Sequence, residues 1–220
     1  MKNWKSAEHV FNALNDNFPY LVIRNFEDFF NSLLMDDHAD LDLLCKKKDR
    51  KKIIRLLEAE PRLDRDDGIH FQFQVASQQI PLDIRYDGDG YYDKNWEKAM
   101  LRSRILDPRG FYRMNADEYF WSLLYHALYH KGTISKEYLL RLEEMKPELF
   151  PADQGGLEAH LSRFMRKHHY YYTISKDHYL WYHFTDVCKR RIRTYPLYHA
   201  YCFKLVCQEF IAKKIGERKN

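Results

Sequence analysis

The stretch ADLDLLC (39–45) alternates acidic and apolar residues, a pattern that is typical of a β-strand with one buried face. Successive side chains in a strand point to opposite faces, so Leu41 and Leu43 share one face while Asp40 and Asp42 share the other. Two ionised carboxylates at this spacing repel each other, and they need a metal ion, basic side chains or open water around them. Taken alone, the pattern also fits a strand whose outer face is simply solvated.

A second alternating stretch, PLDIRY (81–86), contains a third carboxylate in the same kind of pattern. Here Leu82 and Ile84 face one way, and Asp83 and Arg85 face the other. If this strand pairs with ADLDLLC, three carboxylates converge on one face of a sheet. Oxygen-rich sites of this kind hold hard cations such as Mg²⁺, and a pair of such ions suits phosphoryl-type transfer. The two stretches together therefore predict a metal-dependent transfer site.

The segments around these stretches predict an α+β fold. Helical spacing marks residues 5–17, with Ser6 as N-cap, and residues 27–34 and 46–60. Strand patterns mark residues 20–26, 39–45, 69–76 and 79–86, and the last two predict a hairpin. We expect a mixed β-sheet with helices on one face, followed by a mainly helical C-terminal half.

The chain of 220 residues also divides into three predicted regions. Residues 1–92 form the α/β core, and residues 93–150 form a helical region packed on it. After a linker candidate, PADQGG (151–156), residues 157–220 form a mainly helical extension with a short hairpin around residues 170–184.

The order strand, helix, Asp-x-Asp strand, helix, strand and Asp-bearing strand resembles the minimal nucleotidyltransferases of the DNA polymerase β superfamily. The resemblance covers roughly residues 18–90 and implies a nucleotidyltransferase-like core. It implies that Asp40 and Asp42 bind two metals that grip a nucleoside triphosphate. It also implies that Asp83 completes the metal site that faces the acceptor and helps to deprotonate the acceptor hydroxyl.

The first motif departs from the family pattern. That motif usually begins with Gly-Gly or Gly-Ser, whose small residues let a helix N-terminus approach the triphosphate. This sequence has Arg24 and Asn25 at the corresponding place, and neither is a small residue. Asn25 can still cap a helix and donate a hydrogen bond, and Arg24 can pair with phosphate. With Arg85, these two residues are our candidates for nucleotide binding.

The expected reaction is transfer of a nucleoside monophosphate from a triphosphate, with Mg²⁺ or Mn²⁺ as cofactor. Aromatic residues make up 16% of the chain, and tyrosine-rich walls suit stacking on a sugar, a metabolite or a protein side chain. We therefore expect the acceptor to be a hydroxyl or phosphate of a small molecule, a polysaccharide precursor or a protein. The alternative is a non-catalytic module that binds a nucleotide or a partner in the same cleft.

Charge and hydropathy limit the partners and the setting. A net charge of +4 is mild for binding a long nucleic acid, which normally needs a clustered basic stripe. KKKDRKK (46–52) fits the solvated start of a helix better than a phosphate site. The sequence shows no secretory signal, and its longest apolar stretch (119–129) is too short to span a bilayer. The four cysteines form no C-x-x-C pair, so we expect free thiols and a cytoplasmic setting.

Two further motifs allow more than one interpretation. His126 and His130 are four residues apart and project from one helical face, which suits metal binding, although ordinary packing among tyrosines explains them better. A third interpretation places His126, His130 and Lys131 on the far wall of the nucleotide cleft. DGDGYYD (87–93) resembles a calcium loop in part, but its spacing favours a tight turn.

Overall fold

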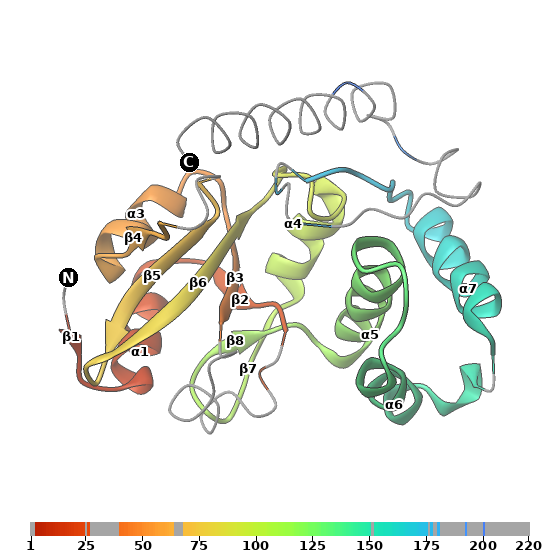
Figure 1. Cartoon of the computed structure of the whole chain (residues 1–220), viewed down its shortest axis with the longest axis horizontal. Helices are drawn as coiled ribbons and strands as arrows, with labels where there is room; N and C mark the ends of the chain where they lie inside the picture. The colour runs from red at the N-terminus through yellow and green to blue at the C-terminus, as the bar shows by residue number, and fades with distance from the viewer. Residues whose placement is uncertain are drawn as a thin grey trace, which may run out of the picture.

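The computed structural model describes residues 3–24, 26, 40–63, 68–150, 152–175, 177, 180, 192 and 200. Eight strands among these residues form one mixed sheet (Figure 1). Seven of them run across the sheet in the order β1-β5-β6-β3-β2-β8-β7, and β4 pairs with β5. The strands are β1 (Asn3–Trp4), β2 (Tyr20–Val22), β3 (Leu41–Cys45), β4 (Glu60–Pro61), β5 (His70–Val75), β6 (Gln78–Tyr86), β7 (Ile105–Leu106) and β8 (Tyr112–Arg113).

The centre of the sheet is the pairing that the two acidic stretches predict. Strands β3 and β6 are parallel, and Asp42 is the register partner of Asp83. Strand β5 is antiparallel to β6 and joins it through a tight turn at Ala76 and Ser77. Both turn residues have positive φ, 48° and 66°, as a two-residue hairpin turn requires. The predicted hairpin is confirmed.

Helices α1 (Ala7–Asn17) and α3 (Arg50–Leu57) cover one face of the sheet. The ring of Phe11 on α1 is stacked on Tyr20, and the guanidinium of Arg50 on α3 lies over Tyr86. Tyr20 and Tyr86 are both register partners of Cys45, so they share the face of Leu41 and Leu43. The opposite face, which carries Asp42 and Asp83, is left for the site.

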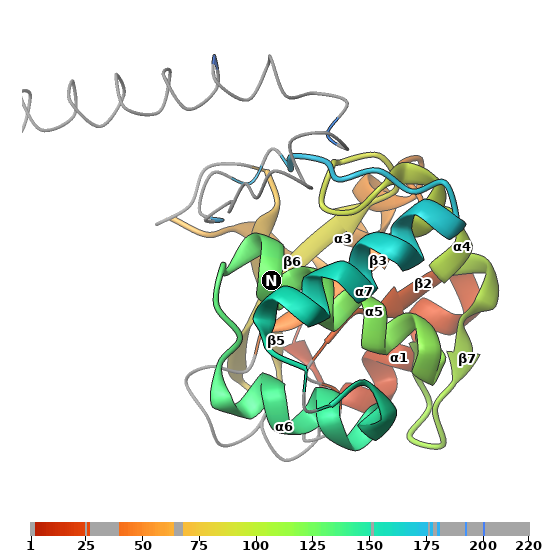
Figure 2. The same ribbon diagram turned by 90° about the vertical axis from the view of Figure 1, so that its right-hand side faces the viewer.

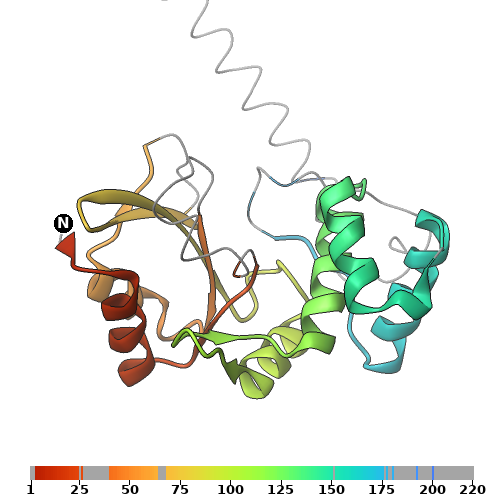
Figure 3. The same cartoon turned by 90° about the horizontal axis from the view of Figure 1, so that it is seen from below.

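The remaining helices pack beside the sheet (Figures 2 and 3). They are α4 (Lys94–Ser103), α5 (Ala116–Tyr125), the π-helical turn η1 (His126–His130), α6 (Lys136–Met145), the 3₁₀ turn η2 (Pro147–Leu149) and α7 (Gln154–Lys167). Trp96 on α4 joins them to the core. Its ring lies against Tyr125 on α5 and Phe164 on α7, and its indole Nε1 donates a 2.6 Å hydrogen bond to Glu118.

The structure also departs from the expected helical region 93–150. Ile105–Leu106 and Tyr112–Arg113 form a short antiparallel hairpin, and β8 pairs with β2 at Val22. Strands of two residues are too short to show alternation, so no sequence pattern marks them. The described residues 170–175 contain no strand, while the rest of the hairpin predicted there lies outside the described residues.

Two more predicted elements, the helix at 27–34 and the closing basic helix, also lie outside the described residues. None of the helices described by the structure combines the length and the apolar character needed to cross a membrane.

Candidate functional site

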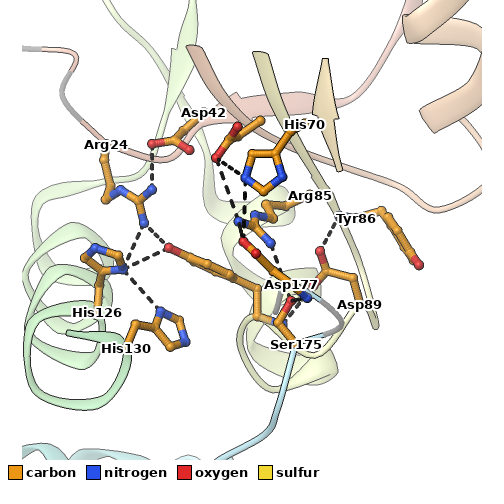
Figure 4. Close-up of polar contacts among 12 residues, drawn as sticks. Arg24, Asp42, His70, Arg85, Tyr86, Asp89, His126, His130, Ser175 and Asp177 are labelled. Carbon is orange, nitrogen blue, oxygen red and sulfur yellow. Dashed lines mark hydrogen bonds and ion pairs between the residues drawn. The ribbon is translucent and has the colours of Figure 1, made fainter. Parts of the chain in front are cut away.

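A polar cavity of about 260 Å³ contains the side chains of Asp42 and Asp83, and we call it the carboxylate cavity. Strands β3, β5 and β6, the end of β2 and the helical half all contribute to its wall (Figure 4). Its lining residues are Arg24, Asp40, Asp42, His70, Asp83, Arg85, Tyr91, His126, Lys131, Tyr138, Asp177 and Leu180. Acids, bases and aromatic rings from distant parts of the sequence therefore meet in one place.

Asp42 and Asp83 form the centre of the cavity. They lie side by side because β3 and β6 pair in parallel at these two residues. Both are buried, with 1% and 7% of their surfaces exposed. In each residue Oδ1 is buried without a hydrogen-bond partner among the described residues. Buried carboxylate oxygens are normally paired, so these two atoms indicate a site for a cationic or hydrogen-bonding ligand.

Arg24, directly after β2, neutralises Asp42. Its Nη2 donates to Asp42 Oδ2 at 2.7 Å, while Nη1 donates to the hydroxyl of Tyr91 and lies 3.0 Å from Nδ1 of His126. The guanidinium is buried and bridges the sheet to the helical half. Arg24 therefore occupies part of the carboxylate cavity and links Asp42 to the helical wall.

A second cluster surrounds Asp83. Nε2 of His70 lies 3.4 Å from Asp83 Oδ2 and 3.8 Å from Asp177 Oδ2. Nη2 of Arg85 pairs closely with Asp177 Oδ2 and lies 3.8 Å from Asp83 Oδ2, while Nη1 donates to Oγ of Ser175 at 3.4 Å. Asp177 thus adds a further carboxylate to the cavity, and it comes from the segment after α7.

The two central carboxyl groups differ in acidity. Burial raises the pKa of Asp42 to about 6, and the nearby charges of Asp83 and Asp40 add to the rise against the attraction of Arg24. Burial also acts to raise the pKa of Asp83, but the hydrogen bond from His70 and the charge of Arg85 bring it below its ordinary value. When the two groups cannot both ionise, Asp42 is the one that holds the proton.

His126 and His130 lie at the helical wall, on the turn η1. A hydrogen bond from Lys131 N to His126 O closes the wide turn, and the Nδ1 atoms of the two histidines lie 3.2 Å apart. Burial, reinforced by the charge of Arg24, lowers the pKa of both rings well below the ordinary value. His126 and Lys131 line the carboxylate cavity, while His130 is completely buried behind His126.

The loop between β6 and α4 positions Tyr91, whose ring lies under Arg85. The Arg85 guanidinium carbon is 4.3 Å from the centre of that ring. Asp89 accepts a hydrogen bond from Tyr91 N, and Glu97 accepts from Gly88 N and Tyr92 N. Positive φ at both loop glycines fits the predicted tight turn.

Two carboxylate oxygens of the cavity are suitable ligands for a divalent cation, but a third ligand is not arranged with them among the described residues. The two partnerless Oδ1 atoms of Asp42 and Asp83 are the kind of ligand that Mg²⁺ or Mn²⁺ prefers. Asp40 lines the same cavity. Within the described ranges, however, no three acidic, histidine or cysteine side chains are arranged together to hold a metal. Metal binding by Asp40, Asp42 and Asp83 stays a prediction.

The structure brings most of the residues named from the sequence into this one cavity. Arg24 and Arg85 line it, but each is paired with a carboxylate of the chain. Asn25 lies outside the described residues. Sequence reasoning missed His70, Tyr91 and Asp177. The sequence did contain a signal for His70, because it alternates with Phe71 and Phe73 and so lies on the opposite face of the hairpin strand. The sequence around Asp177 contains no such pattern.

Comparisons with known proteins give two structural matches. No protein-family model and no curated protein matches the chain. The solution structure of the antibiotic-resistance factor ANT(2'')-Ia matches with 15% sequence identity, covering 73% of this chain and 90% of that chain, at a TM-score of 0.39. The crystal structure of ANT(2'')-Ia in complex with adenylyl-2''-tobramycin matches with 12% identity, covering 72% and 94%, also at 0.39.

Proposed function

We propose that the carboxylate cavity is the active site of a metal-dependent nucleotidyltransferase. The reaction would move a nucleoside monophosphate from a nucleoside triphosphate to a hydroxyl or phosphate group and release pyrophosphate. The observation that carries the proposal is the parallel pairing of Asp42 with Asp83, each with one buried oxygen that lacks a partner among the described residues. Three cationic side chains, Arg24, Arg85 and Lys131, line the same cavity and suit a triphosphate.

In this proposal the basic side chains would bind the triphosphate, and the carboxylates would hold the metal ions. Arg24 and Arg85 carry planar guanidinium groups that can bind phosphate oxygens through two parallel hydrogen bonds. Lys131 would add a point charge at the helical wall. Bound Mg²⁺ or Mn²⁺, held by Asp40, Asp42 and Asp83, would neutralise the triphosphate and align the reacting oxygens.

Asp83 is our candidate for the group that takes the proton of the acceptor. The hydrogen bond from His70 and the charge of Arg85 lower its pKa against the effect of burial, so it is ionised at neutral pH, as a proton acceptor must be. His70 and Arg85 also fix the orientation of the carboxylate. In this proposal the ionised Asp83 takes the proton of the acceptor, and Asp42 helps to hold the cation.

The acceptor is proposed to be small or to present a single side chain. A cavity of about 260 Å³ must hold the reacting groups, and the rings of Tyr91 and Tyr138 form part of its wall. Tyrosine offers a flat apolar face and a hydroxyl, which suits a sugar or a protein side chain. A small molecule, a polysaccharide precursor and a protein hydroxyl all belong to this class.

A non-catalytic binding module is the second candidate, and one observation favours it. Arg24 already neutralises Asp42, and His70 and Arg85 already surround Asp83 and Asp177. A cavity whose carboxylates already contact basic side chains of the chain can bind a nucleotide or partner without a metal. The two candidates therefore differ in whether nucleotide binding depends on a divalent cation.

Calorimetric titration with each nucleoside triphosphate, with and without Mg²⁺, separates the two candidates. The enzyme predicts metal-dependent binding that is lost in Asp42→Asn and kept in Asp16→Asn, a matched change on the exposed face of α1. Incubation with labelled triphosphates, Mg²⁺ or Mn²⁺, and separated protein, RNA and metabolite fractions then identifies the acceptor. Metal-independent binding with no labelling in any fraction would favour the binding module, and label found only in RNA would contradict the proposed acceptor.

A further inference from the structure

A second cavity, of about 530 Å³, lies away from the carboxylate cavity, and we call it the basic cavity. None of the described residues lines both cavities. One wall is the turn between β3 and α3, and the other is α4 with the residues that follow it. Its lining residues are Lys46, Lys47, Lys48, Asp87, Lys94, Lys98, Leu101, Arg102 and Arg104.

The charge of the basic cavity is unusually concentrated. Seven of its nine described lining residues are Lys or Arg, and among these nine only Asp87 is acidic. This excess of six positive charges exceeds the net charge of +4 for the whole chain, so the other residues together are net negative. The mild net charge therefore hides one strongly positive hollow.

Within the part of the chain that the structure describes, the cations of the basic cavity lack carboxylate partners. Among the described residues, none of the seven has a carboxylate within ion-pair distance. The carboxylate of Asp87 is taken up by the backbone, since it accepts a 2.6 Å hydrogen bond from Lys47 N. Elsewhere in the chain, Arg24, Arg85, Arg109 and Arg113 all have carboxylate partners.

The spacing of the cations on α4 supports a ligand. Lys94, Lys98 and Arg102 are four residues apart, so they form one stripe on the helix, next to Leu101. Like charges at this spacing destabilise a helix slightly, and an anion bound between them would reverse the sign of that effect. Lys46 to Lys48 face this stripe across the cavity, so the cations surround a hollow and do not follow an extended track.

We propose that the basic cavity binds a compact polyphosphate, that is, a small molecule with two or more linked phosphate groups. A chain of phosphates presents several negative charges within the space of a few residues, which suits seven cations around one hollow. The ligand is either inorganic or the phosphate part of a nucleotide, because both present the same linked phosphates to the cations. This inference does not depend on the proposed transfer reaction.

Tripolyphosphate in the absence of divalent metal is the probe that tests it. Calorimetry should show binding that weakens as salt increases, because the contacts are ionic. The double change Lys94→Glu and Lys98→Glu should weaken binding at least about tenfold, as expected when two contacts are reversed in sign. Both side chains are exposed, so the fold should be kept.

A matched control changes the net charge equally at another place. Lys136→Glu and Arg163→Glu reverse two exposed helical cations, and Lys136 is the first residue of α6 as Lys94 is of α4. We expect this variant to keep its affinity for tripolyphosphate. Lys131→Glu, in the carboxylate cavity, should keep it as well.

Three outcomes would overturn the inference: no binding at low salt, binding unchanged in the Lys94 and Lys98 variant, or binding lost in the Lys131 variant instead. Titration with ATP and with adenosine separates the two sources, because a nucleotide ligand should bind more tightly than tripolyphosphate. A single-stranded RNA oligonucleotide that binds much more tightly than either, through the same lysines, would assign the cavity to nucleic acid and contradict the proposal.

Discussion

Arg24 connects three groups of the carboxylate cavity: the carboxylate of Asp42, the hydroxyl of Tyr91 and the ring of His126. Its contact with Asp42 does not fully compensate for burial, because the pKa of Asp42 is still raised. The carboxylate cavity therefore keeps a carboxyl group that gains or loses its proton near neutral pH.

The acidity of Asp42 leads to a prediction about stability in the absence of metal. Its folded pKa of about 6 lies above the value of about 3.9 for an unfolded chain. The contribution of Asp42 to the free energy of unfolding is therefore greatest below about pH 4 and decreases as the pH rises to about 6. Asp42→Asn should remove this decrease, as measured by urea unfolding at a series of pH values.

The comparison must be made between variants, because Asp83, Asp89 and Glu97 also have shifted pKa values. Subtracting the Asp42→Asn curve from that of the unchanged protein isolates the contribution of Asp42. Asp16→Asn, on the solvent side of α1, should give a curve parallel to that of the unchanged protein. If Asp42→Asn also ran parallel, the raised pKa of Asp42 would be wrong.

A site residue could be predicted where its neighbours in the sequence show which face of a strand it occupies. Asp42 and Asp83 were predictable because each alternates with buried aliphatic residues, which fixes the face and suggests the pairing. The position of Asp177 in the cavity could not be predicted, because its partner Arg85 is 92 residues away in the sequence. A repeating pattern of apolar residues links only positions that are close in the sequence. The pairing of Arg24 with Asp42 was also missed, because a guanidinium suits phosphate and carboxylate equally well.

At the scale of elements, the loop between β6 and α4 is held from both sides. Asp89 and Glu97 fix it from within, and Thr173, after α7, donates a 2.8 Å hydrogen bond from Oγ1 to the carbonyl of Gly90. Burial raises the pKa of both Asp89 and Glu97, which favours a shared proton between them. This loop carries Tyr91, so its packing against the segment after α7 sets one wall of the carboxylate cavity.

Gly90 is the position at which this packing can be tested. It has φ of +87°, and a Cβ placed there would lie 2.2 Å from the carbonyl oxygen of Ile174. Gly90→Ala should therefore displace the segment that carries Ser175 and Asp177. We expect faster hydrogen exchange at Thr173 and a loss of stability larger than the roughly 1 kcal/mol of backbone strain alone.

Gly110→Ala is the matched control for this change. Gly110 also has positive φ, +93°, but no atom lies within 4 Å of the position that a Cβ would take there. It should show the backbone strain and leave exchange at Thr173 unchanged. Equal losses in the two variants would contradict a role for close packing at Gly90.

Long strands could be predicted from the sequence, and very short strands could not. Strand β6 was predictable because its residues alternate over nine positions. The hairpin turn was expected at Ser77 and Gln78 and lies one residue earlier, at Ala76 and Ser77, where both residues have positive φ. The pair β7 and β8 was not predictable, since each contains only two residues and depends on pairing with its neighbours. The π-helical turn η1 is indistinguishable from ordinary helix in the sequence, because one wide turn changes the apolar spacing too little to be seen.

At the scale of the whole molecule, the sheet and the helical half meet around α4. Trp96 has no exposed surface, and its ring stacks on Tyr170 while touching Phe164 and Tyr125. The side chain of Trp96 thus contacts α5, α7 and Tyr170, which follows α7 in the chain. The two halves should therefore unfold together in a single transition.

Trp96→Ala tests this coupling. Removing a fully buried tryptophan typically costs about 3–5 kcal/mol, and here the lost contacts are those that join α4 to α5, α7 and Tyr170. We expect the urea transition, followed by circular dichroism, to shift to lower concentration and to broaden. Trp121→Ala is the control, because Trp121 is half-buried and contacts Phe120 and Phe164 within the helical half. A larger loss for Trp121→Ala would contradict the proposed junction.

The order in which the residues of the carboxylate cavity are synthesised has a consequence for the folding of the nascent chain. Arg24 leaves the ribosome before Asp42, and Arg85 follows two residues after Asp83, so each central acid is synthesised close in time to a cation that will accompany it. Asp177 and Ser175 are made much later, and until then Arg85 lacks both of its partners from that segment. The carboxylate cavity is therefore assembled in stages, and a chain still attached to the ribosome with residue 177 in the exit tunnel has a complete sheet but an unfinished site.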